Sequence, residues 1–136
     1  RYTMRLVKQR LHQDQFREAV IDAYQGRCAI SNLCEPRLLD AAHIIPDAEE
    51  LGVPVVPNGL PLSKLHHAAY DANLIGIDAN GVVHISERLL EIHDGPLLEQ
   101  GLKAMAGRQI LPPRRDEDRP DKDLLDLRFQ TFRNAA

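Results

Sequence analysis

Two short apolar segments constrain the fold of this 136-residue chain more than any other feature. The first covers residues 38–45, and the second is Leu60-Pro61-Leu62. Residues 46–57 lie between them and are rich in proline and acidic side chains, which is typical of a long surface loop. Ser63 is suited to cap a short helix over residues 64–71. The sequence therefore predicts a strand, a loop, a second strand and a short helix in succession.

The flanks of this core predict helices and a hairpin. Apolar residues from Phe16 to Tyr24 recur at helical spacing and stop before Gly26, and Asn80-Gly81 is a strong hairpin signal between two apolar runs. We expect one α+β domain over residues 1–136, and an initial Arg1 instead of Met suggests a fragment of a larger protein. Its expected parts are a helical segment at 1–26, the core at 38–71, a hairpin at 74–86 and a helical segment at 96–136.

Composition excludes several classes of protein. The net charge of −3 argues against a histone-like protein that binds nucleic acid by bulk charge, and no apolar run approaches the ~20 residues of a membrane helix. Two cysteines without a leader sequence favour a reducing, cytoplasmic setting and are too few for a four-cysteine zinc site. The ends are more basic than the acidic middle. Their basic residues either form a solvated surface or contact phosphate groups. The candidates for such contacts are Arg5, Lys8, Arg10, Arg114 and Arg115.

Residues with chemical potential gather in the predicted core. His67 and Asp71 are four apart, so on a helix they share a face and can bind one divalent ion. His43 and Asp40 lie on the strand toward which that helix returns, and a neutral histidine suits the role of a base near neutral pH. The Asn58 amide can hydrogen-bond backbone groups on both sides of the long loop. A base beside a cation is suited to phosphodiester hydrolysis.

These residues stand in motifs that resemble the HNH endonucleases, whose catalytic unit is the ββα-metal fold. The resemblance implies that His43 is the general base, that Asn58 fixes the loop, and that His67 and Asp71 hold a metal ion. It is strongest for a subgroup in which Phe usually stands where this chain has Tyr70. The three motifs are Asp40-Ala41-Ala42-His43-Ile44-Ile45-Pro46, Asn58-Gly59-Leu60-Pro61-Leu62 and Leu65-His66-His67-Ala68-Ala69-Tyr70-Asp71.

The chain departs from the family pattern at the position before the base. Many HNH enzymes carry Asp or His there as a metal ligand, whereas Ala42 has no donor atom. Asp40 is the expected replacement, and a structural or supporting role is its alternative. The resemblance implies one divalent ion, with Mg²⁺ expected and Mn²⁺ or Zn²⁺ also compatible with such ligands. The paired CxxC motifs of many HNH domains are absent.

The same resemblance implies partners. In this subgroup the HNH domain often follows a reader of modified cytosine, such as an SRA domain, in modification-dependent restriction enzymes. We therefore expect DNA as substrate, a reader domain outside this sequence, a homodimer for double-strand cleavage, and no membrane. His66 points about 100° away from His67 on a helix, so a phosphate contact or simple exposure is expected for it. The alternatives to a DNA endonuclease are a non-catalytic DNA-binding module with a structural metal and an RNA-directed or toxin-type nuclease.

Overall fold

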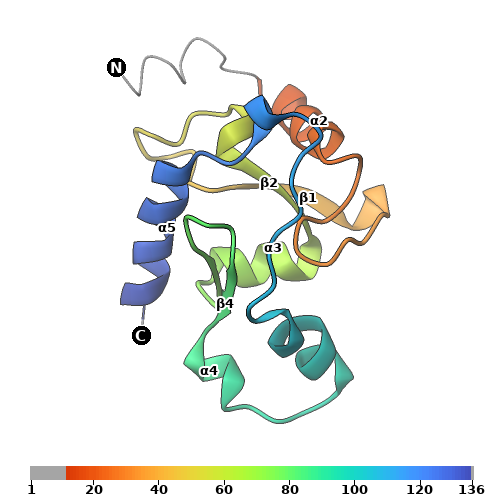
Figure 1. Ribbon diagram of the computed structural model, residues 1–136, viewed down its shortest axis with the longest axis vertical. Coiled ribbons are helices and arrows are strands. Elements are labelled where there is room, and N and C mark those ends of the chain that lie inside the picture. The colour runs from red at the N-terminus through yellow and green to blue at the C-terminus, as the bar shows by residue number, and fades with distance from the viewer. Residues whose placement is uncertain (1–11, 136) are drawn as a thin grey trace.

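The computed structural model describes residues 12–135, and the predicted core lies at its centre (Figure 1). Strand β1, Leu39–His43, pairs antiparallel with β2, Gly59–Ser63. Helix α3, Lys64–Asp71, follows β2 without a break, because the side chain of Ser63 accepts a hydrogen bond from a backbone N–H in the first turn. The ββα order and the α+β class are confirmed.

The flanking elements also follow the sequence pattern. The hairpin turns at Asn80-Gly81, where Gly81 has a φ of +80° that suits glycine. Residues 97–105, expected to be helical, form a wide π-type turn and a 3₁₀ turn. The flanking helices and strands are α2 Gln13–Ala23, β3 Ile75–Ile77, β4 Val83–Ile85, α4 Glu87–Leu90 and α5 Lys122–Asn134, and the shorter turns are η1 Pro36–Leu38, η2 Val56–Asn58, η3 Leu97–Leu102, η4 Lys103–Met105 and η5 Asp116–Asp118.

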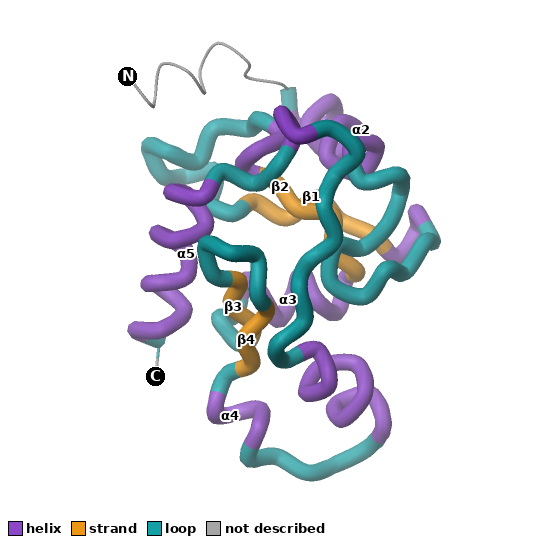
Figure 2. The backbone as a smooth tube through the Cα atoms, in the orientation of Figure 1, coloured by secondary structure: helices purple, strands orange, loops and turns teal. Residues whose placement is uncertain are grey.

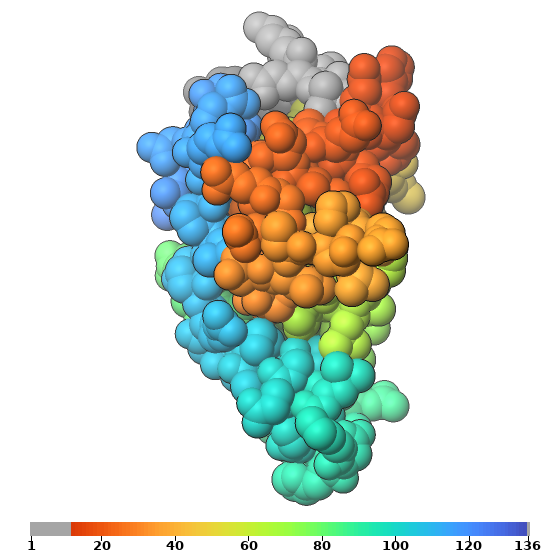
Figure 3. All heavy atoms as spheres, turned by 90° about the vertical axis from the view of Figure 1, so that its right-hand side faces the viewer, coloured from red at the N-terminus to blue at the C-terminus, as the bar shows by residue number. Residues whose placement is uncertain are grey.

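The two small sheets are covered by helices from both ends of the sequence. Helix α2 packs on β1 and β2, α3 lies between the two sheets, and α5 packs against β3 (Figure 2). The segment from α4 to η4 forms the narrow end of the molecule, coloured teal in Figure 3. No helix within residues 12–135 is long and apolar enough to cross a membrane.

Gly59 marks the closest approach of α2 to the sheet. Its backbone is extended, with φ −132°, so the Asn58-Gly59 pair does not form a tight turn. A Cβ atom at this position would lie 2.6 Å from Cγ2 of Val20 and 2.8 Å from Cζ of Phe16, both buried in the core. The glycine therefore allows α2 to pack directly on β2.

We expect Gly59→Ala to destabilise the protein by about 1–3 kcal/mol, because the added methyl group overpacks this contact. Urea unfolding measures the loss. Gly95→Ala is the matched control, since a Cβ at Gly95 meets no atom within 4 Å. Equal stability of the two variants would show that α2 can move away from the strand without cost.

Candidate active site

His43 occupies the last position of β1. Its ring stacks on Phe16 of α2, with centroids 4.5 Å apart and planes inclined by 22°. The Nε2 atom is buried and has no hydrogen-bond partner among residues 12–135, so Nδ1 is the ring nitrogen left to exchange a proton with water. Burial lowers the pKa of His43 below its ordinary value, and the nearby carboxylates of Asp47 and Asp71 oppose this shift without reversing it. The ring is therefore held neutral near pH 7.

Asn58 joins the two ends of the long loop. Its side chain is fully buried, and its Oδ1 accepts a hydrogen bond from the backbone N–H of Ile45 at 2.9 Å. Its Nδ2 donates to the carbonyl groups of Ile45 and Val53, both at 3.1 Å. One amide thus satisfies three buried backbone groups and fixes the chain just beyond His43, which is the contact expected from the sequence.

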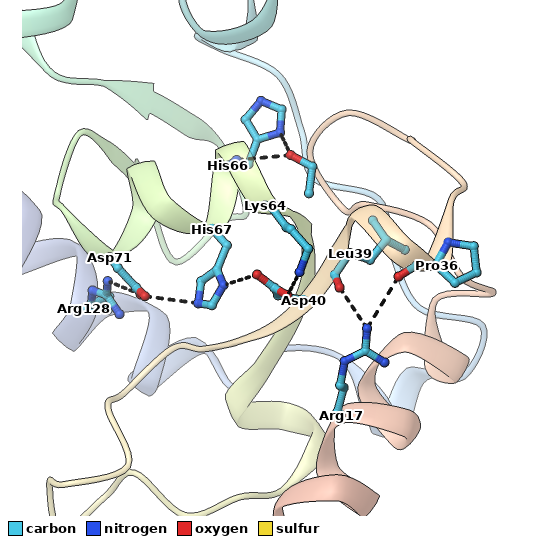
Figure 4. A network of polar contacts seen from close by, with 10 residues as sticks. Arg17, Pro36, Leu39, Asp40, Lys64, His66, His67, Asp71 and Arg128 are labelled. Atoms are coloured by element: carbon cyan, nitrogen blue, oxygen red, sulfur yellow. Dashed lines mark hydrogen bonds and ion pairs between the residues drawn. The ribbon is translucent and has the colours of Figure 1, made fainter.

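His67 lies between two carboxylates (Figure 4). Its Nδ1 is 2.9 Å from Oδ2 of Asp40 on β1, and its Nε2 is 3.1 Å from Oδ2 of Asp71, one turn further along α3. Lys64 contacts the other oxygen of Asp40 at 2.8 Å, and Arg128 of α5 lies 3.8 Å from the other oxygen of Asp71. The result is a line of polar contacts that connects β1, α3 and α5.

Asp40 does not share a side of the ring with Asp71, contrary to the expectation of three converging ligands. Within residues 12–135 no three His, Cys, Asp or Glu side chains surround a common point suitable for a metal ion. Partial burial opposes ionisation of Asp40, but hydrogen bonds from His67 and Lys64 hold the pKa of this carboxyl below its ordinary value. Asp40 is therefore an ionised partner of Nδ1, which leaves Nε2 directed toward Asp71.

The structure contradicts a DNA contact by His66. The residue is only 4% exposed, its Nε2 lies 2.7 Å from the carbonyl oxygen of Gly101, and its Nδ1 lies 2.8 Å from Oγ of Ser63. The helical offset from His67 turns this ring into the protein, where it joins α3 to η3. His66 is a buried structural residue.

The structure describes two of the five basic residues that are expected to contact phosphates. Arg114 and Arg115 are exposed, and Nε of Arg115 is paired with Oδ2 of Asp118 at 3.1 Å. The predicted DNA contacts of Arg5, Lys8 and Arg10 lie outside the described residues.

Arg128 is the residue of this region that sequence reasoning missed. It is 7% exposed and reaches the backbone of β1 and α3 from the closing helix. The signal was present, because Arg128 follows Leu124 by four residues and thus places a charge on the buried face of α5. A charge on such a face needs specific partners, which the sequence alone does not name.

Comparison with known proteins gives a family match for the core and a solved structure with a similar fold. The profile of a family described as HNH endonuclease matches residues 28–78, and no curated protein sequence matches the chain. A solved structure described as a modification-dependent TagI restriction endonuclease has a similar fold, with a TM-score of 0.55 and 19% sequence identity. The likeness covers 84% of this chain and 36% of that one, so this chain spans little more than a third of that protein. The residues that match the HNH endonuclease family, 28–78, therefore contain β1, β2 and α3.

Proposed function

We propose that this chain is the cleavage domain of a metal-dependent DNA endonuclease, and that residues 1–136 form one domain of a longer, restriction-type enzyme. The observation that carries the proposal is the arrangement of His67 between Asp40 and Asp71, beside a neutral His43. A histidine that binds a metal commonly donates its other ring N–H to a carboxylate, which fixes the ring and its tautomer. The match of residues 28–78 to the HNH endonuclease family supports a nuclease.

The donor set suits a divalent ion. His67 through Nε2 and Asp71 through Oδ2 would hold it, and Asp40 would orient the ring from the opposite side. Two protein ligands leave coordination positions for water and a phosphate oxygen, as Mg²⁺ prefers, although Mn²⁺ and Zn²⁺ also accept an imidazole nitrogen. When bound, the ion supplies stabilisation of negative charge on the phosphate and on the departing oxygen.

His43 acts on the attacking water. Its Nδ1 takes a proton as the water oxygen forms a bond to phosphorus and the bond from phosphorus to the 3′ oxygen breaks. The 3′ oxygen leaves with a proton from solvent, giving 5′-phosphate and 3′-hydroxyl ends. Asn58 contributes by holding the chain after His43 in place, since its amide bonds both backbone groups of Ile45.

Several features of the larger enzyme belong to this proposal. Its substrate is DNA in the cytoplasm, its double-strand cleavage uses a homodimer, and a reader of modified bases precedes this domain. The similar structure is described as a modification-dependent restriction endonuclease, which supports DNA as substrate and a reader of modified bases. The homodimer and the cytoplasmic setting rest on the resemblance of the sequence motifs to such enzymes. Exposed Arg114 and Arg115, together with Arg5, Lys8 and Arg10, are the proposed phosphate contacts, and replacing the last three together should flatten the salt dependence of DNA binding.

Supercoiled plasmid, methylated and unmethylated, tests the proposal with Mg²⁺, Mn²⁺ or Zn²⁺ and with EDTA. Nicked or linear product that requires the ion supports it, and absence of cleavage with every ion contradicts it. Competition between DNA and RNA substrates separates the RNA-directed alternative.

Chelation separates the enzyme from the binding-module alternative. We expect EDTA to abolish cleavage and to lower Tm by no more than about 5 °C, because an ion held by two side chains stabilises a domain of this size by only about 1 kcal/mol. Circular dichroism during heating measures this. Unfolding on chelation would instead indicate a structural ion.

A further inference from the structure

We propose that Arg128 is a positioning residue, whose guanidinium sets the place of the base His43 relative to the metal-holding end of α3. This inference rests on the proposed nuclease function. It extends the catalytic unit beyond residues 28–78, which match the family, to the closing helix α5.

Arg128 contacts two segments that are far apart in the sequence. Its Nη1 donates to the carbonyl oxygen of His43, the last residue of β1, at 3.3 Å and to that of Ile44, the next residue, at 2.7 Å. Its Nη2 donates to the carbonyl oxygen of Tyr70 at 2.8 Å and lies 3.8 Å from Oδ1 of Asp71. One rigid, planar group thus holds the backbone of the base and the residues that end α3.

The charged guanidinium of Arg128 is buried. The side chain of Arg128 is 8% exposed, and its guanidinium carbon lies 4.1 Å from the centre of the Tyr70 ring. A buried cation destabilises a protein unless hydrogen bonds and opposite charge compensate it. The three carbonyl groups, the aromatic face and Asp71 provide that compensation, and all of them border the candidate site. The carbonyl groups and Asp71 also occupy both terminal nitrogens of Arg128, so its guanidinium is not available to bind a phosphate.

The shape of the guanidinium distinguishes arginine from lysine at position 128. Lysine would keep a positive charge near Asp71, but a single ammonium group does not reproduce the fork that spans β1 and α3. Loss of the fork removes the link that it forms between the backbone of His43 and the end of α3 that carries Asp71. A misplacement of about 1 Å in a catalytic group can cost about 10²-fold in rate. The charge and the fork are therefore separable by experiment.

The test compares Arg128→Lys and Arg128→Gln with Arg133→Gln, a control at an exposed arginine of the same helix. Tm is measured first, followed by kcat and KM for duplex DNA with Mg²⁺. We expect both Arg128 variants to lose about 10²-fold in kcat with KM changed by less than about threefold, and the control to stay within about twofold. Folded Arg128 variants with wild-type kcat would overturn the proposal, and so would failure of both to fold, which would assign Arg128 to stability.

A second readout does not depend on activity. Imidazole ¹H–¹⁵N spectra of the metal-free protein should show shifted signals for His43 and His67 in Arg128→Lys and unchanged signals in Arg133→Gln. Unchanged imidazole signals in a folded Arg128→Lys protein would also overturn the proposal. If the wild type cleaves no DNA with any ion, the nuclease function fails, whereas the spectra still decide the role of Arg128.

Discussion

Replacement of His43 by alanine is expected to reduce the rate of metal-dependent DNA cleavage by about 10²- to 10⁴-fold, the usual contribution of a general base. The reason is that its Nδ1 is the proposed acceptor of the proton from water, held in place by the stack on Phe16. Loss of the stack costs only about 0.5–1.5 kcal/mol beyond the area buried, so the variant should remain folded. Single-turnover cleavage of a labelled duplex measures the rate.

His93→Ala is the control for this experiment, because His93 is an exposed histidine of the narrow end. It should cleave at the wild-type rate. A His43→Ala protein that retains more than a tenth of wild-type activity would remove His43 from the role of base.

The same assignment fixes the direction of the pH dependence. His43 is active as a base only when neutral, and burial places its pKa below the ordinary value of 6.5. Activity should therefore be lost as pH falls through that lowered pKa and should reach a plateau at higher pH, where the ring is neutral. The acid limb of kcat/KM reports this value for the free enzyme, and a limb centred above pH 7 would contradict the assignment.

Replacement of Asn58 by alanine is expected to have the largest effect on stability. The change leaves the N–H and the carbonyl group of Ile45 buried without the partner that Asn58 provides, at about 1–3 kcal/mol for each group, whereas the carbonyl of Val53 keeps the N–H of Val55 as a donor. The total is a large fraction of the about 5–15 kcal/mol that stabilises a typical protein. Urea unfolding measures the loss, and the same loop release should slow cleavage.

Asn58→Asp sharpens this test. It keeps an acceptor for the N–H of Ile45 but removes the two donors and buries a carboxyl group, so it should destabilise nearly as much as alanine. Asn134→Ala, at the exposed end of α5, serves as the control. A loss below about 1 kcal/mol in Asn58→Ala would mean that the loop is held by other contacts.

Local patterns in the sequence predicted the core because each element is set by near neighbours. Short apolar runs predict the strands, capping at Ser63 predicts α3, and Asn80-Gly81 predicts the hairpin. The side chain of Asn58 was predictable for the same reason, since an amide between two ends of a loop has few alternative partners. The pairing of His67 with Asp71 follows from the helical repeat.

The remaining features depend on packing between distant segments. Asp40 lies at Nδ1 of His67 instead of Nε2, a choice that depends on how β1 packs against α3 and that no spacing in the sequence encodes. His66 is buried because Gly101, 35 residues later, meets its ring. Arg128 lies 85 residues from His43, and the sequence indicates only that a charge lies on the buried face of α5.

The position of Arg128 in the last helix has a consequence for biosynthesis. His43, Asn58, His67 and Asp71 all leave the ribosome before α5 is made, so an unfinished chain contains the proposed base and metal ligands without the guanidinium that joins them. Contacts over so long a separation form late, because the chain must close a long loop first. The proposed site is therefore assembled fully only after residue 128 has been synthesised, and fragments that end before this residue lack the guanidinium that joins its parts.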